Sequence, residues 1–260
     1  MLVLLTAAFA VIAYSGTGAV YVTDLFAEKE RTPLAARAGF GISLGLTLLA
    51  MIAVVIESGI NALLTTRNIM APLSFVIGAG FTLSNLRWPM RGAGAFVAPI
   101  CALLTALFLV EQTREAAVVG MDPLIAVHIG LAVIGMSAFV LAAVLSALYL
   151  MQERQLRQRT FGRLFQRLPS LNALDSATFH LVSVGFITYT VAILLGVTSA
   201  FRGESFGWDF RTAAAVLAWV VFGAVIQTRV TSGWRGRQAA MMTIAGCAMT
   251  FLVLGFYVAS

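Results

Sequence analysis

Two histidines, His128 and His180, are the side chains of this chain best suited to hold a metal ion or a cofactor. A neutral imidazole is a common axial ligand of haem iron, and both residues lie within long apolar runs. An ionisable side chain inside a membrane-spanning helix is a functional-site hypothesis by default. Two simpler interpretations stay open: His128 makes a hydrogen bond between helices, and His180 is a polar group at a helix end near the membrane surface.

Other reactive groups are few. Cys101 and Cys247 lie inside apolar runs and form no CxxC pair, so we expect them to serve as small packing residues. The sequence contains no P-loop, no GxSxG and no HExxH. Because it shows no nucleophile, acid–base pair or metal cluster, we predict a protein that is not an enzyme.

Eight apolar stretches contain or flank these residues. A bilayer core of about 30 Å needs roughly 20 apolar residues of helix to cross it, and a helix satisfies its backbone polar groups internally. The sequence therefore predicts an all-α fold, a polytopic transmembrane helical bundle that forms a single integral membrane domain over residues 1–260. The predicted spans are 2–22, 34–56, 69–86, 93–110, 123–151, 177–200, 211–230 and 238–259.

Basic residues are concentrated in every second connection, and therefore on one side of this predicted bundle. Of the 17 lysines and arginines, 13 belong to the connections after spans one, three, five and seven. Short basic loops stay cytoplasmic, so both termini are predicted to lie outside, in the periplasm. The same alternation explains the net charge of +6 without a nucleic-acid partner. Membrane lipid is the expected surrounding, and the basic run Arg154–Arg167 is suited to contact anionic head groups.

The first apolar stretch, Met1–Val20, has two interpretations. Its small residues near the end are typical of a signal peptide, whose removal would leave seven spans. Such peptides carry basic residues before the apolar run, and this stretch has none there. We therefore expect a retained first helix.

The two histidines are predicted to lie at opposite ends of neighbouring spans. His128 is placed near the outer surface and His180 near the inner one, something like 20–30 Å apart at the helical rise per residue. They therefore cannot ligate the same metal ion. Asp175 and Ser176 are predicted N-caps of the sixth span. Small residues permit close helix packing and direct His128 into the bundle; on its face they are Ala132, Gly135, Ala142 and Ser146.

Glu57, Glu111 and Arg114 are charged residues that lie close to span ends, near the membrane surface. A proton relay needs carboxylates at mid-membrane depth, and none of the eight predicted spans carries one there. This pattern argues against a proton- or ion-coupled transporter.

Seven groups of residues keep their order over 124–259 in a way that is typical of one family. They are Leu124–His128, Ala147–Arg154, Leu168–Asp175, Val184–Phe186 with Leu195–Gly196, Trp208–Arg211, Ala218–Trp219 and Gly233–Ala239. Through them the chain resembles the cytochrome c assembly family, the CcsA-type proteins and their smaller, eight-span HemX/YpjD-like relatives.

The resemblance implies work on haem at the outer face of a bacterial inner (cytoplasmic) membrane, in support of haem attachment to c-type cytochromes. It implies that His128 is an axial ligand of haem iron and that Trp208 offers a stacking surface. Asp209 and Arg211 either position the haem propionates or cap the seventh span. Gln227 stands where the family has a second histidine, and neutral glutamine is a poor iron ligand.

The leading interpretation is an accessory integral membrane protein of cytochrome c biogenesis, which binds or presents haem or holds a synthase. Its expected partners are haem and other cytochrome c assembly proteins. Two alternatives stay open: a cofactor-free structural or regulatory membrane protein, and a small-molecule transporter. Haem binding separates the first interpretation from the other two.

Overall fold

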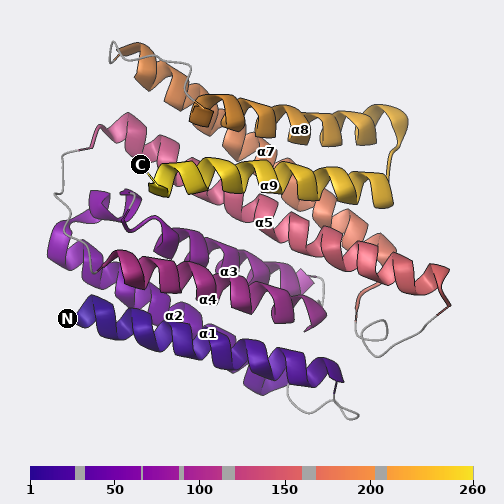
Figure 1. Cartoon of the computed structure of the whole chain (residues 1–260), viewed down its shortest axis with the longest axis horizontal. Coiled ribbons are helices and arrows are strands. Elements are labelled where there is room, and N and C mark those ends of the chain that lie inside the picture. Colours follow the sequence, from indigo (N-terminus) through magenta and orange to yellow (C-terminus); the bar gives the residue numbers. More distant parts are fainter. Residues whose placement is uncertain are drawn as a thin grey trace. The chain divides into compact units, whose positions relative to one another are not determined.

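The protein is helical throughout the part of the chain that the computed structural model describes, namely residues 1–26, 33–65, 67–87, 91–112, 121–159, 168–202 and 210–259. These ranges contain eight α-helices, two short 3-10 helices and no strand (Figure 1). The predicted all-α fold is confirmed.

The helices fall into two compact units. The first comprises residues 1–119 and 151–170, and the second comprises residues 120–150 and 171–260. The first unit holds α1 (Leu2–Phe26), α2 (Pro33–Ser58), η1 (Ile60–Leu64), α3 (Met70–Arg87), η2 (Arg91–Ala93) and α4 (Gly94–Glu111). The second unit holds most of α5 (Pro123–Arg157), together with α7 (Leu171–Arg202), α8 (Phe210–Ser232) and α9 (Arg237–Ala259).

Six helices of the described ranges are long and apolar enough to cross a membrane, by length and composition. They are α1, α2, α4, α5, α7 and α8, and a shorter apolar helix covers Met70–Leu86 in α3. Each predicted span overlaps one of the eight α-helices. The count of eight spans, the outside position of both termini and the single-domain organisation stay predictions.

Local sequence signals explain where the helices of the second unit begin and end. Pro123 occupies the first position of α5, where its missing N–H costs nothing, and the Asp122 carboxylate accepts the N–H of Leu124 at 2.8 Å as a cap. Gly233 and Gly236, both with positive φ, form the short turn from α8 to α9. Only glycine adopts this backbone conformation without steric cost.

The predicted N-caps of the sixth span are wrong. We expected Asp175 and Ser176 to cap the helix from outside, but α7 begins at Leu171 and contains both residues. The polar residues that precede the apolar run continue the helix because they contain no glycine or proline to stop it. Asp175 is therefore a helical residue whose side chain is free to pair with another helix.

In the first unit, small and polar side chains allow close packing. Ser74 of α3 is completely buried and donates to the carbonyl of Cys101 in α4 at 3.0 Å. Its hydroxyl is also 3.0 Å from that of Thr105. Buried hydroxyl pairs of this kind join helices where lipid offers no competing partner. Cys101 is a buried free thiol, as its apolar surroundings predicted.

In the second unit, an aromatic core joins three helices. The rings of Phe139 in α5 and Phe222 in α8 are stacked with centroids 3.5 Å apart, and Tyr189 of α7 meets Phe139 edge-on. Glycines make room for these rings: a Cβ on Gly185 would lie 2.7 Å from Phe139, and one on Gly246 would lie 2.9 Å from Phe222. The core thus sets the spacing of α5, α7, α8 and α9.

Candidate functional site

His128 lies in the second turn of α5 and points at α7. Its Nδ1 atom is 2.5 Å from the carbonyl oxygen of Ala192. A carbonyl oxygen only accepts hydrogen bonds, so Nδ1 carries the proton and donates it. In a neutral imidazole this leaves the lone pair on Nε2, for which the described residues provide no hydrogen-bond donor. The prediction that His128 points into the bundle is confirmed.

Gly196, one turn beyond Ala192 on α7, gives the imidazole its space. A Cβ on Gly196 would lie 2.8 Å from Cε1 of His128 and 3.0 Å from its Nδ1. Contacts this short require the ring to move. The position of His128 therefore depends on a backbone carbonyl and on a missing side chain, both supplied by the same stretch of α7.

This arrangement has the chemistry of a metal-binding histidine. Such ligands donate their second N–H to a carbonyl or carboxylate, which fixes the tautomer and the orientation of the ring. His128 is half-buried, and its Nε2 is not among the unpartnered polar atoms that are buried in the described part of the chain. Because Nδ1 is bonded within the protein and Nε2 keeps its lone pair, His128 is suited to be one axial ligand of haem iron.

The other three predicted site residues lie wholly or partly outside the described part of the chain. Trp208 and Asp209 lie outside the described residues. Arg211 lies in the first turn of α8, but its side chain also lies outside what the structure describes. Their roles as stacking surface and propionate partners stay predictions.

His180 is in a different place and a different environment. Its Nδ1 bonds to the carbonyl oxygen of Ser176 in the same helix at 2.7 Å, and its side chain is exposed. Ala192, the partner of His128, lies twelve residues further along α7, which is about 18 Å at the rise of an α-helix. At this separation the two imidazoles are too far apart to ligate one metal ion. Among the described residues, no three His, Cys, Asp or Glu side chains form a metal-binding group.

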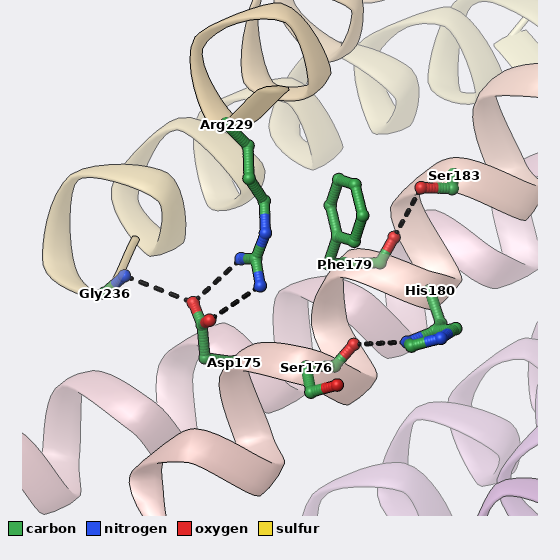
Figure 2. Close-up of polar contacts among 7 residues, drawn as sticks. All are labelled: Asp175, Ser176, Phe179, His180, Ser183, Arg229 and Gly236. Carbon is green, nitrogen blue, oxygen red and sulfur yellow. Dashed lines mark hydrogen bonds and ion pairs between the residues drawn. The ribbon is translucent and has the colours of Figure 1, made fainter. Parts of the chain in front are cut away.

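The opposite end of the second unit contains an ion pair that the sequence analysis missed. Arg229 of α8 donates from Nη1 to Oδ1 of Asp175 in α7 at 3.0 Å, and from Nη2 to Oδ2 at 2.7 Å (Figure 2). Both side chains are only 12% exposed. Two parallel charge-assisted bonds between planar groups form the strongest common ion-pair geometry. The pair joins α7 to α8.

Two further contacts hold this pair, and α5 passes close beside it at Tyr149. The N–H of Gly236, just before α9, donates to Oδ1 of Asp175 at 3.1 Å. The Arg229 guanidinium carbon lies 4.4 Å from the ring centroid of Phe179, a cation–π distance. A Cβ on Gly236 would lie 2.7 Å from the hydroxyl of Tyr149 in α5. Figure 2 shows Asp175 between Arg229 and Gly236, with His180 directed away from them.

Two signals in the sequence pointed to this ion pair. Asp175 and Gly236 both lie in segments that carry the family resemblance. Arg229 lies two residues after Gln227, which stands where the family has its second histidine. Asp175 is predicted above as a cap, and Arg229 is one of the 13 basic residues on which the predicted orientation rests. Sequence spacing alone did not reveal the pairing because the two residues are 54 positions apart.

Together the apolar helices and the paired polar groups inside them define an integral membrane protein. The cytochrome C assembly protein family matches residues 42–260. The chain therefore belongs to this family, as the resemblance predicted. With its several apolar helices it is a multi-pass protein of the bacterial inner membrane.

Individual relatives match at lower coverage. The cytochrome c biogenesis protein CcsA of Synechococcus sp. (strain CC9902) is 26% identical over 193 residues, which cover 61% of this chain and 62% of that protein. CcsA of Synechocystis sp. (strain ATCC 27184 / PCC 6803 / Kazusa) is 30% identical over 89 residues, which cover 34% of this chain and 27% of that protein. The matches thus span less than two thirds of the length of these relatives. No solved structure matches the chain.

Proposed function

We propose that this chain handles haem in cytochrome c biogenesis, and that it does so at the His128 end of its second unit. It would bind or present haem at the outer face of the membrane, or hold a synthase partner there, without making a bond itself. Haem would supply the iron and the two propionates; the chain would supply one axial ligand and the surface around it. Family membership supports the general role in cytochrome c biogenesis.

The observation that carries the proposal is the hydrogen bond from His128 to Ala192. It uses one ring nitrogen inside the protein and leaves the other for a ligand. A histidine that served only to join two helices would need no more than this one bond. Whether Nε2 binds a ligand therefore separates a haem ligand from a purely structural histidine. Trp208, Asp209 and Arg211 enter the proposal as partners of the haem plane and its propionates.

The test is an absorption spectrum of the detergent-purified protein, oxidised and then reduced with dithionite, with and without added haem. We expect a Soret band that saturates near one haem per chain. His128→Ala should abolish the band, and His128→Gly should regain it when imidazole is added.

His180→Ala is the matched control because it removes the only other histidine of the chain. It should bind haem like the unaltered protein. An absence of any band at near-stoichiometric haem, or an equal loss in both alanine variants, would contradict the proposal. The cofactor-free scaffold and the small-molecule transporter would then remain.

A further inference from the structure

We infer that the Asp175 end of the second unit binds one buried water molecule, held by hydroxyl groups of α5 and α7 beside the ion pair. The site is a small cavity of about 10 Å³ within this unit. Its polar lining comes from four helices: Ser146, Tyr149, Asp175, Thr178, Arg229 and Thr243.

Two of the lining hydroxyl groups have no partner. Ser146 is 1% exposed and Thr178 is 8% exposed. The oxygen atoms Oγ of Ser146 and Oγ1 of Thr178 are buried and make no hydrogen bond. More than nine in ten buried polar groups have a partner in protein or ordered water, so two such groups on one cavity indicate a bound molecule. Thr243, by contrast, donates to the carbonyl of Ala239 at 2.8 Å.

The volume of the cavity selects the size of the ligand. A single water molecule needs roughly 10–15 Å³ of such space and two to four polar partners. Ser146 and Thr178 supply two partners that both donate and accept. Oδ2 of Asp175 accepts one bond from Arg229 and retains a free lone pair. A haem or any organic substrate is far too large for this space, because ligand pockets start at about 300 Å³.

The charge of the lining selects a neutral ligand. A sodium ion has a size similar to that of water and also prefers oxygen ligands. The carboxylate of Asp175, however, is already paired with both terminal nitrogens of the Arg229 guanidinium. The lining therefore carries no net negative charge to offset the free-energy cost of dehydrating a cation. The guanidinium of Arg229 would also repel a cation at this site.

A water molecule here would give α5 a polar connection to the other helices. The ion pair and the Gly236 N–H already join α7, α8 and α9. Ser146 provides α5 with a hydroxyl on the same cavity. In a membrane, such a bridge has no competition from bulk solvent. The bound water would complete a junction of all four helices at this end of the unit.

The sign of a stability change tests this inference. Thr178→Val keeps the shape of the side chain and removes its hydroxyl, and Ser146→Ala does the same on α5. If the hydroxyls hold water, each variant should lower the melting temperature by about 2–4 °C. Thr250→Val is the control, because the Thr250 hydroxyl is buried and donates to the carbonyl of Cys247 in its own helix. Such a local bond within one helix adds little to stability, so this variant should change little. An unchanged or raised melting temperature in both cavity variants would overturn the inference.

Two further measurements separate water from other occupants and do not depend on variants that fold poorly. In water-edited solid-state NMR of the bilayer-embedded protein with labelled threonine, Thr178 should receive magnetisation from water despite its burial, and Thr250 should not. Equal, weak transfer to both residues would contradict a bound water. A melting temperature that is higher in sodium chloride than in choline chloride of equal ionic strength would overturn the inference in favour of a cation.

Discussion

The two ends of the second unit use polar side chains in opposite ways. At the Asp175 end, a carboxylate, a guanidinium and a backbone N–H satisfy one another within 3.1 Å. At the His128 end, one ring nitrogen is bonded to Ala192 and the other has no hydrogen-bond partner among the described residues. Both ends belong to the same four helices and both lie in segments that carry the family resemblance.

The contrast separates a stabilising polar cluster from a binding one. A buried group whose bonds are complete contributes to stability, and an added ligand gains little from it. A group that is oriented by one bond and open at another position is prepared for a ligand. Between the Asp175–Arg229 ion pair and His128, the histidine is therefore the better candidate for function.

The largest effect is expected from removal of Asp175. Asp175→Ala leaves the Arg229 guanidinium buried without its carboxylate and should lower the free energy of unfolding by about 3 kcal/mol. Unfolding in mixed micelles, followed by tryptophan fluorescence, would measure the change. Haem binding should be unaffected once the protein is folded, because His128 of α5 contacts α7 at Ala192, far along that helix from Asp175.

Glu153→Ala provides the comparison for this variant. Glu153 pairs with the exposed Arg157 one turn away at 2.8 Å, and such surface pairs contribute less than about 1 kcal/mol. Asp175→Leu combined with Arg229→Met should recover much of the lost stability, because no buried charge remains. If Asp175→Ala and Glu153→Ala proved equally mild, the Asp175 end would not be the stabilising cluster described above.

The next effect is expected at Gly236. Gly236→Ala forces a side chain onto a residue with φ of 76° and places its Cβ against the hydroxyl of Tyr149. We expect a loss of about 2 kcal/mol in the free energy of unfolding. Gly233→Ala isolates the backbone contribution, since Gly233 also has positive φ but no atom near its Cβ position. A smaller loss for Gly236→Ala than for Gly233→Ala would show that Tyr149 yields easily.

The third effect is expected at Gly196, which packs against His128. Gly196→Ala pushes the His128 ring away from its bond to Ala192 and should weaken haem binding about tenfold, as other disturbances around a metal ligand do. A haem titration followed by absorbance would measure the affinity; this prediction rests on the proposed function. Gly130→Ala, near His128 on α5 but with no atom near its Cβ position, should leave the affinity unchanged. Equal affinities in the two variants would remove Gly196 from the site.

The smallest effect is expected between the two ends. Trp219 of α8 donates from its indole nitrogen to the hydroxyl of Thr190 in α7 at 2.9 Å, and its ring stacks on Phe186. Trp219→Phe keeps the stack and removes the bond, so the free energy of unfolding should fall by about 1 kcal/mol. Thr190→Val should cost the same amount and add nothing in the double variant. Additive losses would show that the bond does not form.

The helices were predictable from the sequence because each depends on a continuous local run of apolar residues. All eight predicted spans coincide with α-helices, although α5 and α7 extend beyond the apolar limits at Arg157 and Leu171. The extensions were missed because membrane length says nothing about a polar helix outside the bilayer. The inward orientation of His128 was predicted by the small residues on its face.

The partners of the polar residues were not predictable in the same way. That His128 bonds to Ala192, and that Gly196 makes its space, depends on how α5 and α7 are rotated and aligned. Asp175 reaches Arg229 and Gly236 only because α7, α8 and α9 come together at one end.

The amino-acid sequence thus determines the solvent, the helices and the family of this protein, since apolar runs and ordered short motifs are properties of the chain alone. Which polar groups are satisfied and which stay open follows only from the packed helices. Hydrogen bonds require atoms within about 3 Å of each other, and residues separated by more than fifty positions reach that distance only after the bundle has formed.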